Sequence, residues 1–518
     1  MRSKLAYFII LLLTAGLYVQ VGSFANQAQA ADRLKLCHND YKKYSQKYMQ
    51  QLSELFEQAK IADAPELSDK VEKHLILLSS KQKKFSELPK TLQSEIPDNL
   101  PEDIRELHLR FRTLTDKYAA DLYLLARRAI KISPTFTFEL LNILLEIDPD
   151  HAKARSLRGY VRQGDQWLTP FERDQIRAGK VEHPRFGWLK KSYVKKYEQG
   201  ERNFMGNWIS AEKEAEIRRD FRYAWTVRTE HFQIKTNHSL EKGVELGRKL
   251  EIFYDYFKQT FAAFYNSPEQ IKQFFESTTG RSKTRSQLYK INHFRNKDEY
   301  VKKLIKRVPQ IAITNGLYQL EDRTAYFYYD PQANFDATIF HEVTHQLMYE
   351  SHLKQRDIAN NGHFWIIEGI ANYTESFRIK PNGDGFTYDG FTYEVGDPHF
   401  VRFYWARKRL LDEDYFVPQD KFSRMGRIVY QTGSTPLLQK RYSQAAGLAH
   451  FYMHYKNGVY RNALMIYMAQ IYHSSPRVRS RVRGLDVLIG VDYPTLDRQY
   501  REYLQDQLEE VGDDEVIQ

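Results

Sequence analysis

Two histidines four residues apart, His341 and His345, are the residues of this chain best placed to bind a metal ion. On an α-helix such residues project from one face, about one turn or roughly 6 Å apart. Two neutral imidazoles at this spacing can hold one zinc ion, and Glu342 would lie beside it. Glu368 follows 23 residues after His345. A third ligand there would leave one zinc position open for water, as a catalytic site requires. This is the ligand layout of a metallopeptidase.

Both ligand-bearing segments have the periodicity of helices. In residues 335–349 a stripe at strict i+4 spacing comprises Phe335, Ile339, Val343 and Leu347. Glu368 lies in a second apolar-periodic segment, which precedes a chain-breaking run at residues 381–385. The alternative interpretation is a pair of core helices whose histidines are merely buried and hydrogen-bonded. Helical periodicity around both groups favours the metal site.

The HExxH segment is followed by a helix of the type W-x-x-E-G-x-A-x-Y-x-E, and the pair resembles the gluzincin group of zinc peptidases. More narrowly, it is similar to the peptidase-MA-like gluzincins, secreted bacterial proteins that often have helical-repeat flanks. The motifs span about residues 325–377, and a weaker similarity in layout extends from about residue 167 to the C-terminus. The resemblance implies that His341, His345 and Glu368 bind Zn²⁺ and that Glu342 is the general base. It also implies that Asn372, one turn after Glu368, orients a ligand histidine without adding charge.

The implied reaction is peptide-bond hydrolysis. Zinc lowers the pKa of a bound water and polarises the scissile carbonyl, while Glu342 would move the proton from water to the leaving amine. The oxyanion needs a further donor, which gluzincins usually take from a Tyr or His downstream of the third ligand. Tyr442 is the predicted donor and His450 is the alternative. A packing role for Tyr442 competes with this prediction, since the chain contains 36 tyrosines.

A hairpin is predicted for residues 316–329, directly before the HExxH helix. In gluzincins an edge strand at this location pairs with the extended substrate backbone. An ordinary core hairpin is the other interpretation, and the two are compatible. The chain has no Gly-x-Met-Glu-Asn segment, which captures the free amino terminus in aminopeptidases of this group. An endopeptidase acting on protein or peptide substrates is therefore favoured.

The N-terminal residues predict a secretory signal peptide. Arg2 and Lys4 precede an apolar run from residue 5 to about 19, and small residues at Ala28 and Ala30 favour cleavage after Ala30. We therefore expect a secreted, periplasmic or cell-surface protein. The apolar run is short for a membrane span, so no stable transmembrane anchor is expected. The only cysteine, Cys37, excludes an intrachain disulfide.

The formal net charge of +11 favours acidic partners, such as cell-wall polymers or acidic proteins. Basic stretches at residues 281–285 and 477–483 could be such contacts, although runs of this kind are more often solvated loops or helix faces. The sequence has no zinc-finger, phosphate-loop or RNA-binding signature. Nucleic acid is therefore not an expected partner.

The predicted fold class is α+β: a zincin-like catalytic domain, with a twisted sheet, an active-site helix and a helical C-terminal subdomain, preceded by a helical region. We expect a signal peptide at 1–30, a helical region at 31–164, a connector at 165–207, a zincin N-terminal subdomain at 208–350, a helical C-terminal subdomain at 351–507 and an acidic tail at 508–518. One helix junction near residues 140–154 resembles a tetratricopeptide unit. The helical region would act as a propeptide, a docking domain or a packing domain.

The sequence thus favours a secreted zinc-dependent endopeptidase of gluzincin type. One alternative is a secreted helical scaffold whose zinc site is inactive or structural. Another is a zinc amidase that cleaves cell-wall crosslinks with the same residues. Glu342 favours catalysis over the scaffold, because a structural zinc site needs only ligands.

Overall fold

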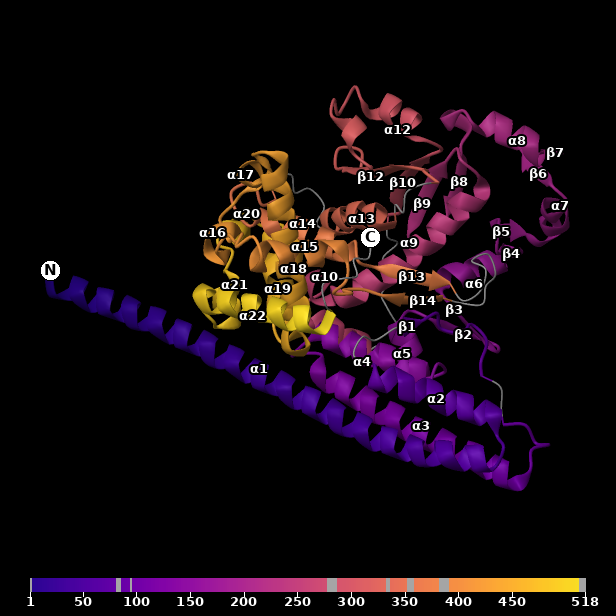
Figure 1. Cartoon of the computed structure of the whole chain (residues 1–518), viewed down its shortest axis with the longest axis horizontal. Helices are drawn as coiled ribbons and strands as arrows, with labels where there is room; N and C mark the ends of the chain where they lie inside the picture. Colours follow the sequence, from indigo (N-terminus) through magenta and orange to yellow (C-terminus); the bar gives the residue numbers. More distant parts are fainter. Residues whose placement is uncertain are drawn as a thin grey trace.

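The computed structural model describes residues 2–80, 85–93, 96–276, 287–331, 336–351, 358–381 and 391–511, with the backbone alone at 2–31, 268, 391 and 508–511. Within these ranges helices surround one five-stranded sheet, one three-stranded sheet and three separate hairpins (Figure 1). The α+β class and the helical C-terminal part are confirmed. The basic stretch 281–285, the side chains of the predicted signal peptide and residues 512–518 of the acidic tail lie outside what is described.

The N-terminal region consists of helices α1 (Arg2–Ile61), α2 (Pro65–Ser79), α3 (Glu102–Ala129), α4 (Pro134–Ile147) and α5 (Ala152–Leu157). Helix α4 begins with Pro134 in its first turn. Ser133 caps the helix, because its side chain accepts a hydrogen bond from the backbone N–H of Phe136. It is largely buried, and Glu139 on it pairs with Arg461 at 3.0 Å. The N-terminal helices are therefore packed onto the rest of the chain. None of the helices in the described part combines the length and apolarity of a membrane span.

Residues 161–218, most of which were predicted as a connector, contain three hairpins that are each followed by a short helix. The units are β2 (Val161–Gln163), β3 (Gln166–Leu168) and α6 (Pro170–Arg177); β4 (Lys180–His183), β5 (Gly187–Lys190), η1 (Lys191–Tyr193) and α7 (Val194–Glu198); and β6 (Glu201–Phe204), β7 (Asn207–Ser210) and α8 (Ala211–Arg218). Gly179 and Gly200, at φ +73° and +88°, end α6 and α7 in the left-handed conformation. Figure 1 shows the units following one another along one side of the molecule.

The central sheet has the strand order β11-β12-β10-β9-β8. Its strands are β8 (Trp225–Arg228), β9 (Phe232–Thr236), β10 (Tyr289–Phe294), β11 (Gly316–Gln319) and β12 (Thr324–Tyr328). Strands β9, β10 and β12 are parallel, whereas the edge strands β8 and β11 are antiparallel to their neighbours. The predicted hairpin is therefore confirmed, and its first strand lies at the sheet edge.

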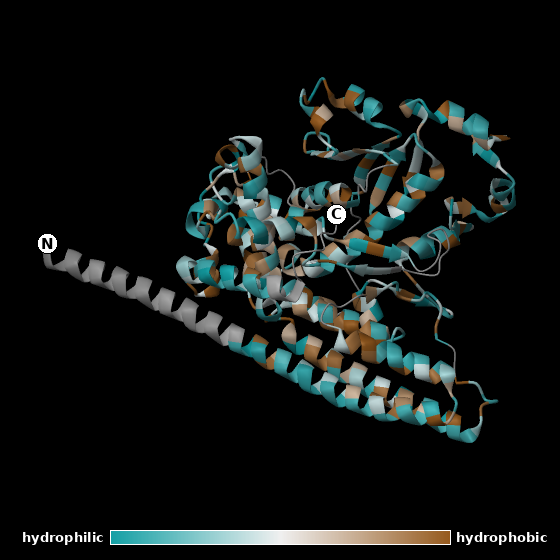
Figure 2. Ribbon diagram, in the orientation of Figure 1, coloured by the Kyte–Doolittle hydropathy of each residue, from teal (hydrophilic) through white to brown (hydrophobic). Residues whose placement is uncertain are grey.

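The two faces of the sheet are covered by different helices. The helices in this part of the chain are η2 (Phe221–Tyr223), α9 (Leu240–Thr260), α10 (Ala262–Tyr265), α11 (Pro268–Glu276), α12 (Lys297–Leu304), η3 (Ile311–Ile313) and α13 (Asp336–Glu350). Ala325 and Phe327 belong to the core shared with α9 and α13, whereas Tyr326 and Tyr328 pack with α12. Successive residues of a strand point to opposite faces, so one strand anchors both layers. Figure 2 shows the corresponding mixture of hydrophobic and hydrophilic residues along the sheet and its helices.

The C-terminal part is built around α14 (Phe364–Thr374), in which every residue is buried. The other helices are α15 (Val401–Leu411), α16 (Gln419–Ser423), α17 (Arg427–Gln431), α18 (Thr435–Gly458), α19 (Arg461–Ile471), α20 (Pro476–Arg479), α21 (Leu485–Ile489) and α22 (Tyr493–Val511). Strands β13 (Arg378–Pro381) and β14 (Phe391–Glu394) form a small sheet with β1 (Phe85–Ser86). This sheet is a second connection between the N-terminal region and the rest of the chain.

Close packing of α14 against α18 depends on Gly369. A Cβ atom at this position would lie 2.8 Å from the backbone oxygen of Ala445, which cannot move independently of α18. We expect Gly369→Ala to lower the free energy of unfolding by about 1–2 kcal/mol, because the overlap outweighs the gain in helix propensity. Thermal unfolding measures this loss. Gly362→Ala is the control, since its nearest atom would be at 3.6 Å; equal melting temperatures for the two variants would contradict the prediction.

Candidate metal centre

His341 and His345 on α13 and Glu368 on α14 bring one donor atom each to a common point. The Nε2 atoms of the two histidines are 3.1 Å apart, and Glu368 Oε2 lies 3.6 Å from the first and 3.7 Å from the second. Zinc–ligand bonds of about 2.0–2.1 Å in a tetrahedral site place ligand atoms about 3.3 Å apart. The three spacings fit such a site. This is a group able to hold a metal ion, formed by the three residues that the sequence predicted.

A carboxylate fixes the orientation of His341. Its Nδ1 atom lies 2.8 Å from Glu375 Oε1, and Arg402 on α15 donates two hydrogen bonds to the same carboxylate, at 2.8 and 3.0 Å. An ionised carboxylate only accepts hydrogen bonds, so the proton of the neutral imidazole belongs on Nδ1. The lone pair of Nε2 is then directed at the common point, as metal binding requires.

The charges around this point favour a cation. Burial opposes the protonation of His341, but its hydrogen bonds to Glu368 and Glu375 outweigh that effect and raise its pKa to about 10, so a metal ion that binds Nε2 would displace a proton. Burial likewise opposes ionisation of Glu368, yet the charge of His345 and hydrogen bonds from both histidines lower the pKa of that carboxyl. The pKa of Glu375 is also lowered, against burial, by Arg402 and His341. Two ionised, buried carboxylates therefore face the imidazole pair, which is an environment that stabilises a bound metal cation.

Asn372 does not make the contact predicted for it. Its Nδ2 atom donates to the backbone oxygen of Tyr442 at 3.2 Å, so it joins α14 to α18. The histidine support assigned to Asn372 is made by Glu375, seven residues after Glu368 on the same helical face. Glu375 is the last residue of the W-x-x-E-G-x-A-x-Y-x-E pattern, so the sequence carried a signal for it. The role of Arg402 could not have been predicted from this pattern, because Arg402 lies on a different helix.

Glu342 is held by the edge strand of the sheet. Its Oε2 atom accepts a hydrogen bond from the backbone N–H of Tyr318 on β11, at 2.8 Å. This contact connects the residue after the first histidine to the strand that was predicted to bind substrate. The Glu342 residue is half-buried.

Tyr442 and His450 lie on the same helix, α18, but in different surroundings. Burial raises the pKa of Tyr442, and the negative charge of Glu368 raises it further. His450 is buried, with Nε2 bonded to the oxygen of Gly396 at 3.0 Å and Nδ1 to the hydroxyl of Tyr503 at 2.9 Å. Both of its ring nitrogens are engaged in the core. Tyr442 is therefore the better placed of the two predicted donors.

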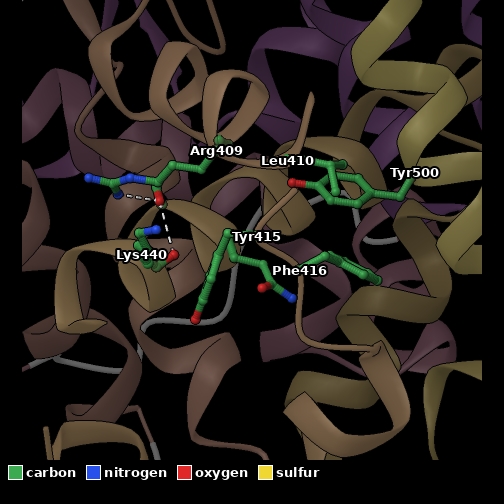
Figure 3. Close-up of a pocket in the computed structure, with 9 residues that line it drawn as sticks. Arg409, Leu410, Tyr415, Phe416, Lys440 and Tyr500 are labelled. Atoms are coloured by element: carbon green, nitrogen blue, oxygen red, sulfur yellow. Dashed lines mark hydrogen bonds between the residues drawn. The ribbon is translucent and has the colours of Figure 1, made fainter. Parts of the chain in front are cut away.

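A separate hollow lies between α15, α18 and α22, away from the metal centre (Figure 3). Its two basic side chains are already partnered: Arg409 donates to the Gln439 backbone oxygen and to Ser443 Oγ, and Lys440 pairs with Glu413 at 2.7 Å. None of the three candidate ligands lines it. It has no arrangement of groups that would carry out chemistry.

Residues 336–476 match a family described as "Protein of unknown function (DUF1570)". The matched segment begins with α13 and includes both histidines, Glu368, Glu375 and Tyr442. No match to a curated protein was found. The family match therefore covers the part of the chain that carries the candidate centre, without itself assigning an activity.

Proposed function

We propose that the protein is a zinc-dependent endopeptidase of gluzincin type. The observation that carries this proposal is the convergence of His341, His345 and Glu368 on one point, with Glu342 on α13 held by the edge strand β11. Two imidazoles and one carboxylate are the protein ligands of known catalytic zinc sites, and they leave a fourth position open. A purely structural site would have no chemical need for Glu342.

Zinc bound at this point would supply Lewis-acid polarisation of the substrate carbonyl and of a water molecule. Glu342 would accept the proton of that water and pass it to the leaving amine. Glu375 would keep His341 in the tautomer that binds metal. The hydroxyl of Tyr442 would donate to the oxyanion as negative charge develops on it. A tyrosine hydroxyl is protonated, and therefore a donor, at neutral pH, and the raised pKa of Tyr442 does not change this.

The substrate that suits this geometry is an extended polypeptide. Among the described strands β11 pairs with β12 alone, so it is an edge strand to which an extended substrate could add. Tyr318 N–H holds the carboxylate of Glu342 at this edge, so a substrate strand added there would lie beside the proposed base. We further propose that the protein acts outside the cytoplasm, after cleavage of residues 1–30, and that its positive charge attracts acidic cell-wall polymers or proteins.

Metal reconstitution tests the proposed function. We expect the purified mature protein to bind about one zinc ion per chain and to cleave an unfolded protein such as reduced casein. Removal of the metal with a chelator should abolish cleavage, and one equivalent of zinc should restore it. Elemental analysis and peptide mapping of the digest give the two readouts.

His345→Ala is the matched control, because it removes one predicted ligand and should prevent reconstitution. A native protein that binds no metal would contradict the site assignment. Bound zinc without cleavage of any protein or peptide would instead favour the scaffold interpretation. Cleavage of peptidoglycan crosslinks but not of casein would favour the amidase.

A further inference from the structure

The turn between β11 and β12 is attached to helix α13 by an ion pair. Arg323, the last residue of the turn, donates from Nε and Nη2 to Glu350 Oε2 at 3.0 and 2.5 Å. Glu350 is the last residue of α13, and its side chain is only 3% exposed. Gln346, one turn earlier on the same helix, donates to the other carboxylate oxygen at 2.9 Å. The carboxylate is therefore held both by the turn and by its own helix.

The backbone of Arg323 lies in the left-handed region, at φ +54°. This conformation is unfavourable for a residue that has a Cβ atom, and glycine adopts it more readily. The side chain of Arg323 makes contacts that glycine could not make: the ion pair with Glu350 and a hydrogen bond to the exposed Gln287 at 3.0 Å. These contacts offset the cost of the backbone conformation.

Together with Tyr318, the ion pair attaches β11 to α13 at two points. Tyr318 N–H donates to Glu342, and Arg323 donates to Glu350, which is about two turns or 12 Å farther along the helix. A strand attached at one point can pivot about it, whereas two separated points fix its direction as well as its place. The hydroxyl of Tyr318 lies 3.5 Å from Glu350 Oε1, so this side chain spans the distance between the two points.

The second attachment matters because β11 is an edge strand. Among the described strands it pairs with β12 alone, so its position depends on β12 and on α13. Helix α13 also carries His341 and His345. Whatever fixes β11 relative to α13 therefore fixes an added substrate strand relative to the candidate ligands. An ion pair with a buried partner suits this task, because desolvation offsets much of its attraction and its main contribution is to geometry.

We infer that Arg323 and Glu350 are positioning residues, whose ion pair sets where an extended substrate lies relative to the metal centre. This inference rests on the proposed function and adds a determinant outside the ligand set. Among the described residues neither Arg323 nor Glu350 is hydrogen-bonded to a candidate ligand or to Glu342, so the pair acts through β11. A misplacement of the substrate by about 1 Å can lower a rate by about 10²-fold, so a residue remote from the chemistry can have a large effect.

Two matched peptides test the pair. One is long enough to lie along β11, and the other is the same sequence shortened to the residues that flank the cut. We measure kcat/KM for both on the zinc-loaded wild type and on Arg323→Gly, in which glycine accepts the left-handed conformation and only side-chain contacts are lost. The long-to-short ratio of kcat/KM should fall roughly 10-fold or more, because the long peptide alone depends on the position of β11. This ratio does not depend on the fraction of enzyme that is folded, so a loss of stability alone leaves it unchanged.

Three further variants complete the test. Arg307→Gln is the control, because Arg307 pairs with Asp322 of the same turn at 2.7 Å but lies on the loop after α12; it should keep the wild-type ratio. Glu350→Gln should lower the ratio as much as Arg323→Gly does. Combining Arg323→Gly with Glu350→Gln should add little to either, as expected for two residues that act as one unit.

Hydrogen exchange provides a second readout that does not depend on turnover. In the substrate-free Arg323→Gly protein, the amides of β11 should exchange faster than in the wild type. The amides of β9 and β10, which lie farther into the sheet, should keep their protection.

The outcomes separate the two proposals. Peptide cleavage with an unchanged long-to-short ratio in both Arg323→Gly and Glu350→Gln would overturn the positioning role and leave the peptidase assignment standing. Faster exchange throughout the sheet would also overturn it, since the pair would then contribute only to general stability. Bound zinc with no cleavage of any protein or peptide would remove the proposed function, and with it the substrate strand that the pair is inferred to position.

Discussion

Replacing Glu342 by glutamine is expected to lower kcat for peptide hydrolysis by about 10²- to 10⁴-fold, the usual contribution of a general base. Glutamine has nearly the same shape and keeps an oxygen that can accept the hydrogen bond from Tyr318 N–H. Strand β11 and helix α13 should therefore keep their relative positions. What is lost is the ability to take a proton from water, so the defect should appear in kcat with little change in metal binding.

The measurement is kcat on a cleavable peptide, together with zinc content by elemental analysis. Glu321→Gln is the matched control, because Glu321 is an exposed acid in the β11–β12 turn and its loss changes the net charge equally. We expect the control to retain wild-type kcat. Full activity in a zinc-loaded Glu342→Gln protein would show that the base is another residue or that the chemistry is different.

Local sequence patterns were sufficient to predict the elements that position the site. The i+4 stripe from Ile339 to Leu347 predicted α13, because a helix buried on one face carries a periodic apolar stripe. The apolar context of Glu368 predicted α14, because a helix buried on all sides is apolar throughout. The aromatic-rich second arm of the β11–β12 hairpin, which Asp330-Pro331 ends, likewise predicted strands before the metal helix. Together these patterns were enough to name the three residues that converge in space.

The three hairpin–helix units were missed for a physical reason. Their strands are only three or four residues long, which is too short for alternation to stand out from chance. The available signal was a long-range one: Trp167, Trp188 and Trp208 recur at spacings of 21 and 20 residues, each on the second strand of its hairpin. Such a repeat is found by comparing segments with one another, whereas local propensity does not show it.

The partner of His341 could not be chosen from helix geometry alone. Asn372 and Glu375 lie four and seven residues after Glu368, so both project from nearly the same face of α14. The outcome depends on a third element: Arg402 from α15 pairs with Glu375 and makes an ionised carboxylate stable at a buried position. The three candidate ligands could be predicted from local spacing, whereas the residues that orient them depend on tertiary packing.

Because Glu375 orients His341, its replacement should have a large effect on zinc binding. We expect Glu375→Gln to weaken zinc binding by about 10- to 100-fold, the usual result of altering the group that orients a ligand histidine. Glutamine would keep an oxygen for His341 but would remove the negative charge that favours both the Nδ1–H tautomer and a cation nearby. Competition with a chromophoric chelator measures the zinc Kd in the folded protein.

Asn372→Ala is the discriminating control for this prediction. Asn372 contributes a hydrogen bond between α14 and α18, and no hydrogen bond between it and His341 occurs among the described residues. Its replacement should therefore lower the melting temperature while leaving zinc affinity within a few-fold of wild type, since a lost buried hydrogen bond affects stability by about 1–3 kcal/mol. If Asn372→Ala weakened zinc binding and Glu375→Gln did not, the sequence-based assignment of Asn372 would be correct. The Arg402–Glu375 pair would then serve only to join α15 to α14.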